Sequence, residues 1–211
     1  MKYFIGLVLF FIMMNGFALD PVWEEISNKD GIKVYTASVP GTTVKGFKGE
    51  TIMNDSIEKI LYVIMDDEHR SKWVKRLKVS KMLEEISDYE AIMYQEIELP
   101  WPLKNRDFVF WGKIERPEKG KVILKMKSVK HKDAPKTVGI RGELLLSKYV
   151  LTSLGKSKTK IEVEILTDPK GLIPKWLVNM IQAQWPYKTF KAIGRQLKKD
   201  YTKEYSLPPF K

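Results

Sequence analysis

Two spacings of apolar residues divide this chain into segments of different structure. Over residues 77–166 apolar and polar positions alternate, a pattern typical of half-buried antiparallel strands. The alternation is clearest at residues 160–165, where lysine or glutamate alternates with isoleucine or valine. The pattern predicts strands at residues 77–84, 91–99, 107–114, 121–129, 138–151 and 158–166. Because no helical segment lies between them, we expect one antiparallel sheet.

The N-terminal part mixes strands with short helices. Pro21 suits the first turn of a short helix over residues 20–29. Turns containing glycine then introduce two strands, the second of which spans residues 43–53. Apolar residues at helical spacing follow between Ile57 and Ile64, and a second short apolar segment comes after a polar break.

A long C-terminal helix is predicted from Pro174 to Tyr201, because large apolar residues recur there at steps of three and four. Pro186 lacks a backbone N–H, so the helix should kink there. The predicted fold class is therefore α+β: a curved antiparallel sheet wrapped around a long C-terminal helix, with two short helices inserted after the second strand. The space between sheet and helix is either filled core or a pocket, and apolar spacing is compatible with both.

Residues 1–18 have the composition of a secretory signal peptide. Lys2 supplies a positive charge, an apolar segment follows, and Gly16 and Ala18 place small residues where a signal peptidase cleaves. The alternative is a retained membrane anchor, although residues 3–18 are fewer than the ~20 that a spanning helix needs. We therefore expect a signal peptide (1–18), one domain (19–205) and a C-terminal tail (206–211), in a protein exported to the bacterial periplasm or secreted.

Composition narrows the class of protein further. Of the 211 residues 44% are hydrophobic, so the chain can bury a substantial core. Cysteine is absent, which excludes disulfides, thiol catalysis and a lipid-modified cysteine. The formal net charge of +11 suits transient contact with an anionic membrane surface, or else marks a solvated basic surface. Export argues against a nucleic-acid partner.

Several short strings resemble the START (StAR-related lipid-transfer) domain of the helix-grip superfamily. They are Trp23 with Gly31-Ile32-Lys33-Val34-Tyr35, then Phe47-Lys48-Gly49-Glu50, Arg70-Ser71-Lys72-Trp73, Arg106-Asp107-Phe108-Val109, Arg141-Gly142 and Asp168-Pro169-Lys170-Gly171-Leu172-Ile173-Pro174-Lys175-Trp176-Leu177-Val178-Asn179. No string is specific alone, but their order and spacing together are, and the resemblance covers residues 23–201. The central string, from Pro100 to Phe110, looks most like phosphatidylcholine-binding members.

The resemblance implies a START-like lipid-binding domain with a hydrophobic tunnel between the sheet and the C-terminal helix. Such a tunnel holds one lipid or similar hydrophobic molecule, and the helix and nearby loops gate it for transfer. Sterol-binding members place an acid and a base in the pocket, whereas the matching positions here are Met93 and Gly112. We therefore expect an acyl-chain lipid in preference to a sterol.

Six residues are expected to bind the ligand. They are Arg106, Arg141, Tyr94, Trp176, Met180 and Ile181. A guanidinium group binds a phosphate or carboxylate well, but Arg106 and Asp107 could instead form a salt bridge that pins the central turn. Arg141 could likewise have a structural partner on its strand. The three helix residues line either the pocket or ordinary core.

A row of basic residues follows on the outer face of the C-terminal helix. They are Lys188, Lys191, Arg195, Lys198 and Lys199. Such a face is either simply solvated or docks on an anionic bilayer, where each basic residue adds ~1 kcal/mol.

Catalysis has little support in the sequence. The two histidines lack a metal-ligand spacing, and neither a nucleophile elbow nor a phosphate loop is present. We expect no catalytic residue, no metal and no cofactor. The alternative function is an enzyme that resembles the polyketide cyclases and hydrolases of the same superfamily and acts on a small apolar substrate in the same pocket.

Overall fold

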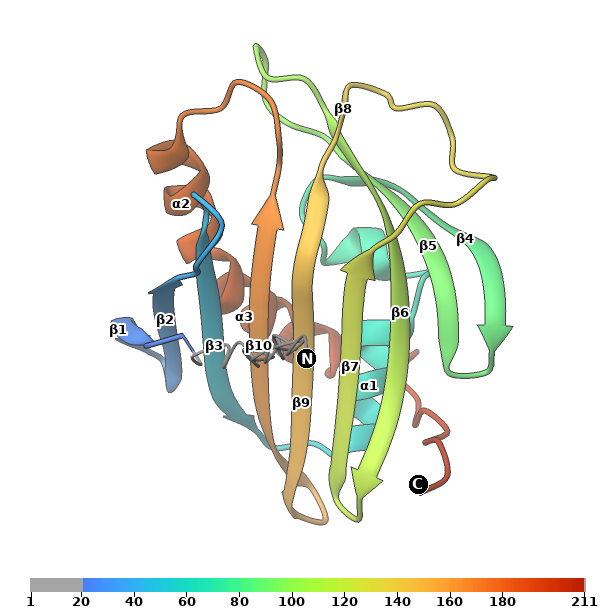
Figure 1. The fold of residues 1–211 in the computed structure, drawn as a ribbon. Helices are drawn as coiled ribbons and strands as arrows, with labels where there is room; N and C mark the ends of the chain where they lie inside the picture. Colours follow the sequence, from blue (N-terminus) through green and yellow to red (C-terminus); the bar gives the residue numbers. More distant parts are fainter. Residues whose placement is uncertain (1–20, 211) are drawn as a thin grey trace, which may run out of the picture.

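The computed structural model describes residues 21–210, which form a ten-stranded sheet with helices against one face (Figure 1). The strands are β1 (Glu24–Lys29), β2 (Ile32–Ser38), β3 (Lys45–Met53), β4 (Leu77–Ser87), β5 (Glu90–Ile97), β6 (Arg106–Glu118), β7 (Lys121–Ser128), β8 (Ile140–Arg141), β9 (Glu143–Gly155) and β10 (Lys158–Asp168). The helices are α1 (Ile57–Met65), the 3-10 turn η1 (Arg70–Lys72), α2 (Lys175–Ala183) and α3 (Trp185–Gln196). The predicted signal peptide lies outside the described residues.

The strands follow the order β1-β2-β3-β10-β9-β7-β6-β5-β4. All neighbours in this order are antiparallel, and the two-residue strand β8 pairs with β6 in parallel. The last strand, β10, lies between β3 and β9, so the N-terminal strands join the same sheet as the central meander. This arrangement confirms the predicted curved antiparallel sheet with C-terminal helices.

The helix predicted over residues 20–29 is wrong, because residues 24–29 form strand β1. Asp30 and Gly31 adopt left-handed conformations, with φ of 54° and 72°, and make a tight turn between β1 and β2. Val22 and Ile26 remain exposed. The apolar spacing that suggested a helix therefore leaves these two residues in solvent, and pairing with β2 decides the conformation.

The C-terminal helix is broken rather than kinked. α2 ends at Ala183 and α3 begins at Trp185, with Pro186 in the first turn of α3, where its missing N–H breaks no intrahelical hydrogen bond. Residues 197–201 are no longer helical. The two predicted short segments after the N-terminal strands are α1 and η1, and they follow β3 because β1 is itself a strand.

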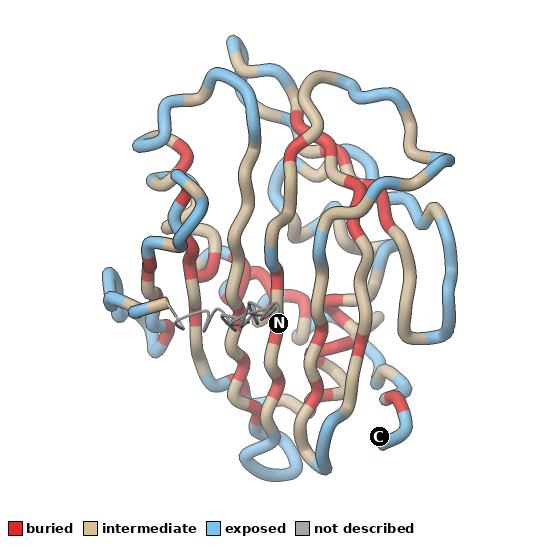
Figure 2. The backbone as a smooth tube through the Cα atoms, viewed as in Figure 1, coloured by how far each residue is buried: buried red, intermediate tan, exposed pale blue. Residues whose placement is uncertain are grey.

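The main hydrophobic core lies where α1 and α3 cover the sheet. Figure 2 shows buried residues on these helices and on the strand segments around them. Ile60 and Leu61 of α1 and Phe190 and Ile193 of α3 belong to this core, together with inward-facing residues of most strands. Within residues 21–210, α2 contributes no residue to it. The end of the sheet near α2 is therefore packed differently from the rest.

Gly49 of β3 permits the close approach of α3 to the sheet. A Cβ atom at Gly49 would lie 2.5 Å from Cβ of Pro186 and 2.9 Å from Cε2 of Phe190. We expect Gly49→Ala to lower the free energy of unfolding by about 1–3 kcal/mol, because a buried side chain is added where there is no room. Gly194→Ala is the matched control, since a Cβ there meets no atom within 4 Å.

The Gly194→Ala change should raise the free energy of unfolding by about 0.5–1 kcal/mol, because alanine favours a helix interior. Urea unfolding of both variants measures the difference. Equal effects of the same sign would contradict the close β3–α3 contact.

Candidate functional site

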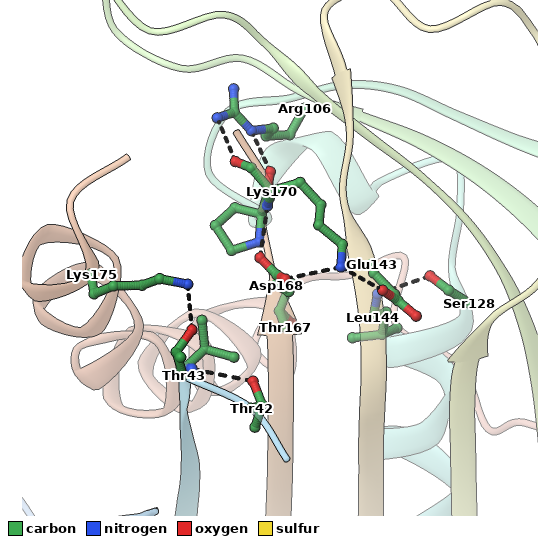
Figure 3. Close-up of polar contacts among 12 residues, drawn as sticks. Thr42, Thr43, Arg106, Ser128, Glu143, Leu144, Thr167, Asp168, Lys170 and Lys175 are labelled. Atoms are coloured by element: carbon green, nitrogen blue, oxygen red, sulfur yellow. Dashed lines mark hydrogen bonds and ion pairs between the residues drawn. The ribbon is translucent and has the colours of Figure 1, made fainter. Parts of the chain in front are cut away.

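Arg106 is buried at the start of β6, and its guanidinium group donates hydrogen bonds to backbone carbonyl oxygens (Figure 3). Nε donates to the carbonyl oxygen of Pro169 at 2.6 Å, and Nη2 donates to that of Lys170 at 3.1 Å. Nη1 donates to the carbonyl oxygen of Lys104 at 2.5 Å. Burial lowers the pKa of Arg106 from its usual value. Arg106 thus joins the β5–β6 loop to the β10–α2 loop.

Asp107, the next residue, is fully buried and pairs with Arg141. Its carboxylate accepts hydrogen bonds from Nε and Nη2 of Arg141, at 3.1 and 2.5 Å, and from Oγ1 of Thr137 at 2.7 Å. The hypothesis of a salt bridge between Arg106 and Asp107 is therefore wrong: the two side chains point to different partners. Arg141 does have a structural partner, which was the alternative to ligand binding. This partner, Asp107, lies on β6 and not on the strand of Arg141 itself.

Tyr94 of β5 belongs to the same cluster. The Arg141 guanidinium lies 5.9 Å from the centre of the Tyr94 ring, a distance at which a cation is attracted to the ring face. Burial raises the pKa of the Tyr94 hydroxyl, and the negative charges of Asp107 and Glu96 raise it further. Three of the six predicted site residues, Arg106, Arg141 and Tyr94, are thus brought together at this end of β5 and β6.

The base of the β10–α2 loop is held by ion pairs (Figure 3). Nζ of Lys170 lies 2.8 Å from a carboxylate oxygen of Glu143 and 3.0 Å from one of Asp168. Burial alone would raise the pKa of Asp168, but hydrogen bonds from Lys170 bring it below its usual value. The loop is therefore fixed at its base, whereas Leu172, further along it, is fully exposed.

The other three predicted residues lie on α2 and are open to solvent. Trp176 is 68% exposed, Met180 49% and Ile181 52%, and Val178 is the buried residue of this helix. Polar contacts connect α2 to the sheet: Oδ1 of Asn179 accepts from the backbone N–H of Lys45 at 3.3 Å. The six predicted site residues thus fall into two groups. One is Arg106, Arg141 and Tyr94, and the other is the three residues of α2; the β10–α2 loop connects them.

Two buried polar atoms where α2 meets β10 lack a hydrogen-bond partner within the described residues. They are Oγ1 of Thr167, near the end of β10, and Oε1 of Gln182 in α2. Nε2 of Gln182 donates to the backbone oxygen of Thr167 at 2.9 Å, so the two residues are neighbours. Residues 164–168 of β10 are only partly buried. Neither residue was predicted from the sequence, where the only available signal was the polar Gln182 within an apolar helix face.

Tyr149 lies further along the sheet, on β9, and Arg70 of η1 is near enough to act on its pKa. Burial raises the pKa of Tyr149, and the charge of Arg70 partly offsets this. The Tyr149 ring contacts Trp185 edge to face, with ring centres 6.5 Å apart. Nε of Arg70 lies 2.8 Å from Oδ1 of Asp67. Arg70 belongs to one of the strings that resemble the START domain, but it is not among the six predicted site residues.

Two pockets lie away from the predicted site. One, of about 360 Å³, lies between the start of the described chain and β2, and the other, of about 230 Å³, lies between the β6–β7 and β9–β10 turns. Neither is lined by a residue of α2 or by Arg106, Arg141 or Tyr94. The tunnel remains a prediction. Among residues 21–210, no helix is long and apolar enough to span a bilayer, and no three acidic or histidine side chains cluster as metal ligands would.

Comparisons with known proteins agree with this geometry. A curated protein of Pseudomonas aeruginosa, described as uncharacterized, is 29% identical over 84% of this chain and 88% of its own length. The phosphatidylcholine transfer protein of Bos taurus is 26% identical over 74% of this chain and 75% of its own. The crystal structure of human STARD10 superimposes with a TM-score of 0.77 at 25% identity, covering 84% of this chain and 74% of that one.

The START domain family model matches residues 15–191. This match includes the sheet, α1, α2 and the first half of α3. Since it spans well over half of the sequence, the chain belongs to the START domain family.

Proposed function

We propose that this protein binds one lipid-like molecule between α2 and the sheet and transfers it between membranes. The observation that carries the proposal is the packing of α2. This helix leaves Trp176, Met180 and Ile181 between 49% and 68% exposed, while the core formed by α1 and α3 ends short of it. Bovine phosphatidylcholine transfer protein, a relative of this chain, is named for lipid transfer.

An apolar ligand supplies the contacts that α2 lacks. Removing apolar surface from water gains roughly 25 cal/mol per Å², so acyl chains beside α2 stabilise the complex strongly against water. The same chains lose little when they return to a bilayer, and this near-balance permits loading and release. The break at Gln184 separates α2 from the well-packed α3, so α2 can move while α3 keeps its place in the core.

An acyl-chain lipid fits the inner surface better than a sterol. Met93 is buried and a Cβ at Gly112 would meet Cγ of Met126, so the two positions that hold polar groups in sterol-binding relatives are apolar here. Thr167 Oγ1 and Gln182 Oε1 provide unpaired hydrogen-bonding atoms next to α2, suited to the polar part of a glycerolipid.

Exposed apolar residues in two loops support a proposal of membrane contact. Trp101 in the β5–β6 loop and Leu172 in the β10–α2 loop are almost fully exposed, and Arg106 holds these two loops together. The basic residues on and after α3 are exposed as well, and Lys191 pairs with Asp30 at 3.4 Å. We propose that the loops enter the bilayer surface while the basic residues contact anionic head groups.

We also propose export to the bacterial envelope. The support is the charged, apolar and small-residue pattern of residues 1–18, together with a relative from Pseudomonas aeruginosa. Cell fractionation of the tagged full chain, with mass determination of its N-terminus, distinguishes a cleaved signal peptide from a retained anchor.

Lipid binding is tested by native mass spectrometry of the protein after incubation with phospholipid vesicles. We expect a mass increase of one lipid per chain, and transfer of labelled phospholipid from donor to acceptor vesicles. A protein that takes up no lipid and transfers none would contradict the proposal. Turnover of a small apolar substrate without lipid uptake would support the enzyme alternative instead.

A further inference from the structure

A second pocket lies at the opposite end of the sheet from α2. The β6–β7 turn, the β9–β10 turn and the first turn of α1 line it, and the C-terminal segment contributes Leu207 (Figure 1). We call it the turn pocket. Oγ1 of Thr159 donates to the backbone oxygen of Asp55 at 2.8 Å and fixes the start of α1 beside β10. The N–H of Ser153 donates to the backbone oxygen of Gly120 at 2.7 Å and holds the two turns together.

Positive charge dominates the turn pocket. Its lining includes Arg116, Lys119, Lys121 and Lys156, against one acidic residue, Glu58. Lys121 is paired with Glu118 at 3.1 Å, outside the lining. Within residues 21–210, no ion pair engages Arg116, Lys119 or Lys156. Within the described residues, three cations without an ion pair therefore line one pocket, and two of them, Lys119 and Lys156, are exposed.

Arg116, which lines the turn pocket, has a hydrogen-bond donor without an acceptor. Its Nε is buried and has no hydrogen-bond partner within the described residues. The guanidinium carbon lies 4.0 Å from the centre of the Phe210 ring, so the C-terminal segment holds the group in place by a cation–π contact. A buried guanidinium N–H without an acceptor is costly, and an anionic acceptor would remove that cost.

The size of the pocket limits the ligand. Its volume of about 230 Å³ is below the roughly 300–1,000 Å³ of pockets that enclose drug-sized molecules. It suits one small anionic group. A phosphate monoester carries about −1.5 to −2 charges at pH 7 and three strong acceptor oxygens, which match several cations and the positive end of α1.

We propose that the turn pocket binds a phosphate monoester group, carried either by a soluble compound or by a lipid head group. Arg116, near the end of β6, and Lys156, in the β9–β10 turn, are the main contacts. The Ser56 hydroxyl in the same lining accepts from the N–H of Lys59 and can still donate to a ligand, whereas the Ser153 hydroxyl already bonds to the backbone of Gly155. The site is separate from the lipid site proposed at α2, so each can be tested without the other.

Isothermal titration calorimetry with inorganic phosphate, at constant ionic strength, tests the site in the full chain. We expect saturable binding by the wild-type protein and binding at least about tenfold weaker in Arg116→Gln and in Lys156→Gln, since each removes a charge-assisted contact. Lys132→Gln is the matched control, because it removes the same charge from an exposed position outside the pocket. Thermal unfolding of each variant confirms that it is folded.

Vesicles distinguish the two sources of the phosphate. Vesicles with phosphatidic acid present a monoester, whereas vesicles with phosphatidylglycerol, at equal surface charge, do not. A preference for phosphatidic acid that is lost in Arg116→Gln identifies a lipid head group; pocket-dependent phosphate binding without this preference identifies a soluble compound. No saturable phosphate binding by the wild type, or an equal loss in Lys132→Gln, would overturn the proposal.

Discussion

Replacing Arg141 with methionine is expected to lower the free energy of unfolding by about 3–5 kcal/mol. The Asp107 carboxylate is fully buried, and Arg141 supplies the positive charge that compensates it. Within residues 21–210, Oγ1 of Thr137 would then be the one remaining side-chain donor to this carboxylate. A buried carboxylate without its cation is costly, because a single neutral hydroxyl does not compensate a charge that is shielded from water.

Urea unfolding at neutral pH measures this loss. Arg195→Met is the matched control: Arg195 is exposed, and its loss should change stability by no more than about 0.5 kcal/mol.

The double variant Asp107→Leu, Arg141→Met completes the test. It removes both charges, and we expect it to be more stable than Arg141→Met alone, because no buried charge remains unpaired. If Arg141→Met alone cost less than about 1 kcal/mol, the ion pair would not hold this end of the sheet in the way the contacts indicate.

Replacing Met180 with aspartate is expected to reduce lipid affinity at least tenfold with little effect on stability. Met180 is 49% exposed, so the folded protein without lipid gains little from it. Burying a methionine side chain is worth about 1.5–3 kcal/mol, and each 1.4 kcal/mol corresponds to a factor of ten in affinity. A carboxylate facing acyl chains adds its own desolvation penalty.

Met82→Asp is the matched control for this change. Met82 is 47% exposed, almost the same as Met180, but it lies on β4 at the far edge of the sheet. Vesicle transfer of labelled phospholipid should be lost in Met180→Asp and retained in Met82→Asp, while urea unfolding of both stays near the wild type. Equal transfer by the two variants would contradict a lipid site at α2.

Much of the fold was predictable because it rests on local patterns. The alternation at residues 160–165 recurs as the buried and half-buried sides of β10, and the helical spacing from Ile57 to Ile64 forms α1. The failures have a common cause. Val22 and Ile26 have helical spacing, but pairing across the Asp30-Gly31 turn makes this segment a strand. The spacing of apolar residues predicts which of them can lie on one face of a helix or strand. It does not predict whether that face packs against another part of the protein.

The candidate site was predictable in its residues but not in their partners. Arg106 and Asp107 attract attention as charges beside an apolar strand. Two of the three carbonyl oxygens that Arg106 binds lie 63 and 64 residues further along the chain, and Arg141, the partner of Asp107, lies 34 residues away. The turn pocket could not be found at all from the sequence, because its lining comes from four separate segments that only the fold brings together.

A crystal structure of the protein loaded from phospholipid vesicles tests the central claim most directly. We predict continuous density for one lipid between α2 and the facing strands, with acyl chains against Met180 and Ile181 and a polar group near Thr167 and Gln182. A structure in which the protein's own side chains fill that space completely, with no lipid bound, would contradict the account.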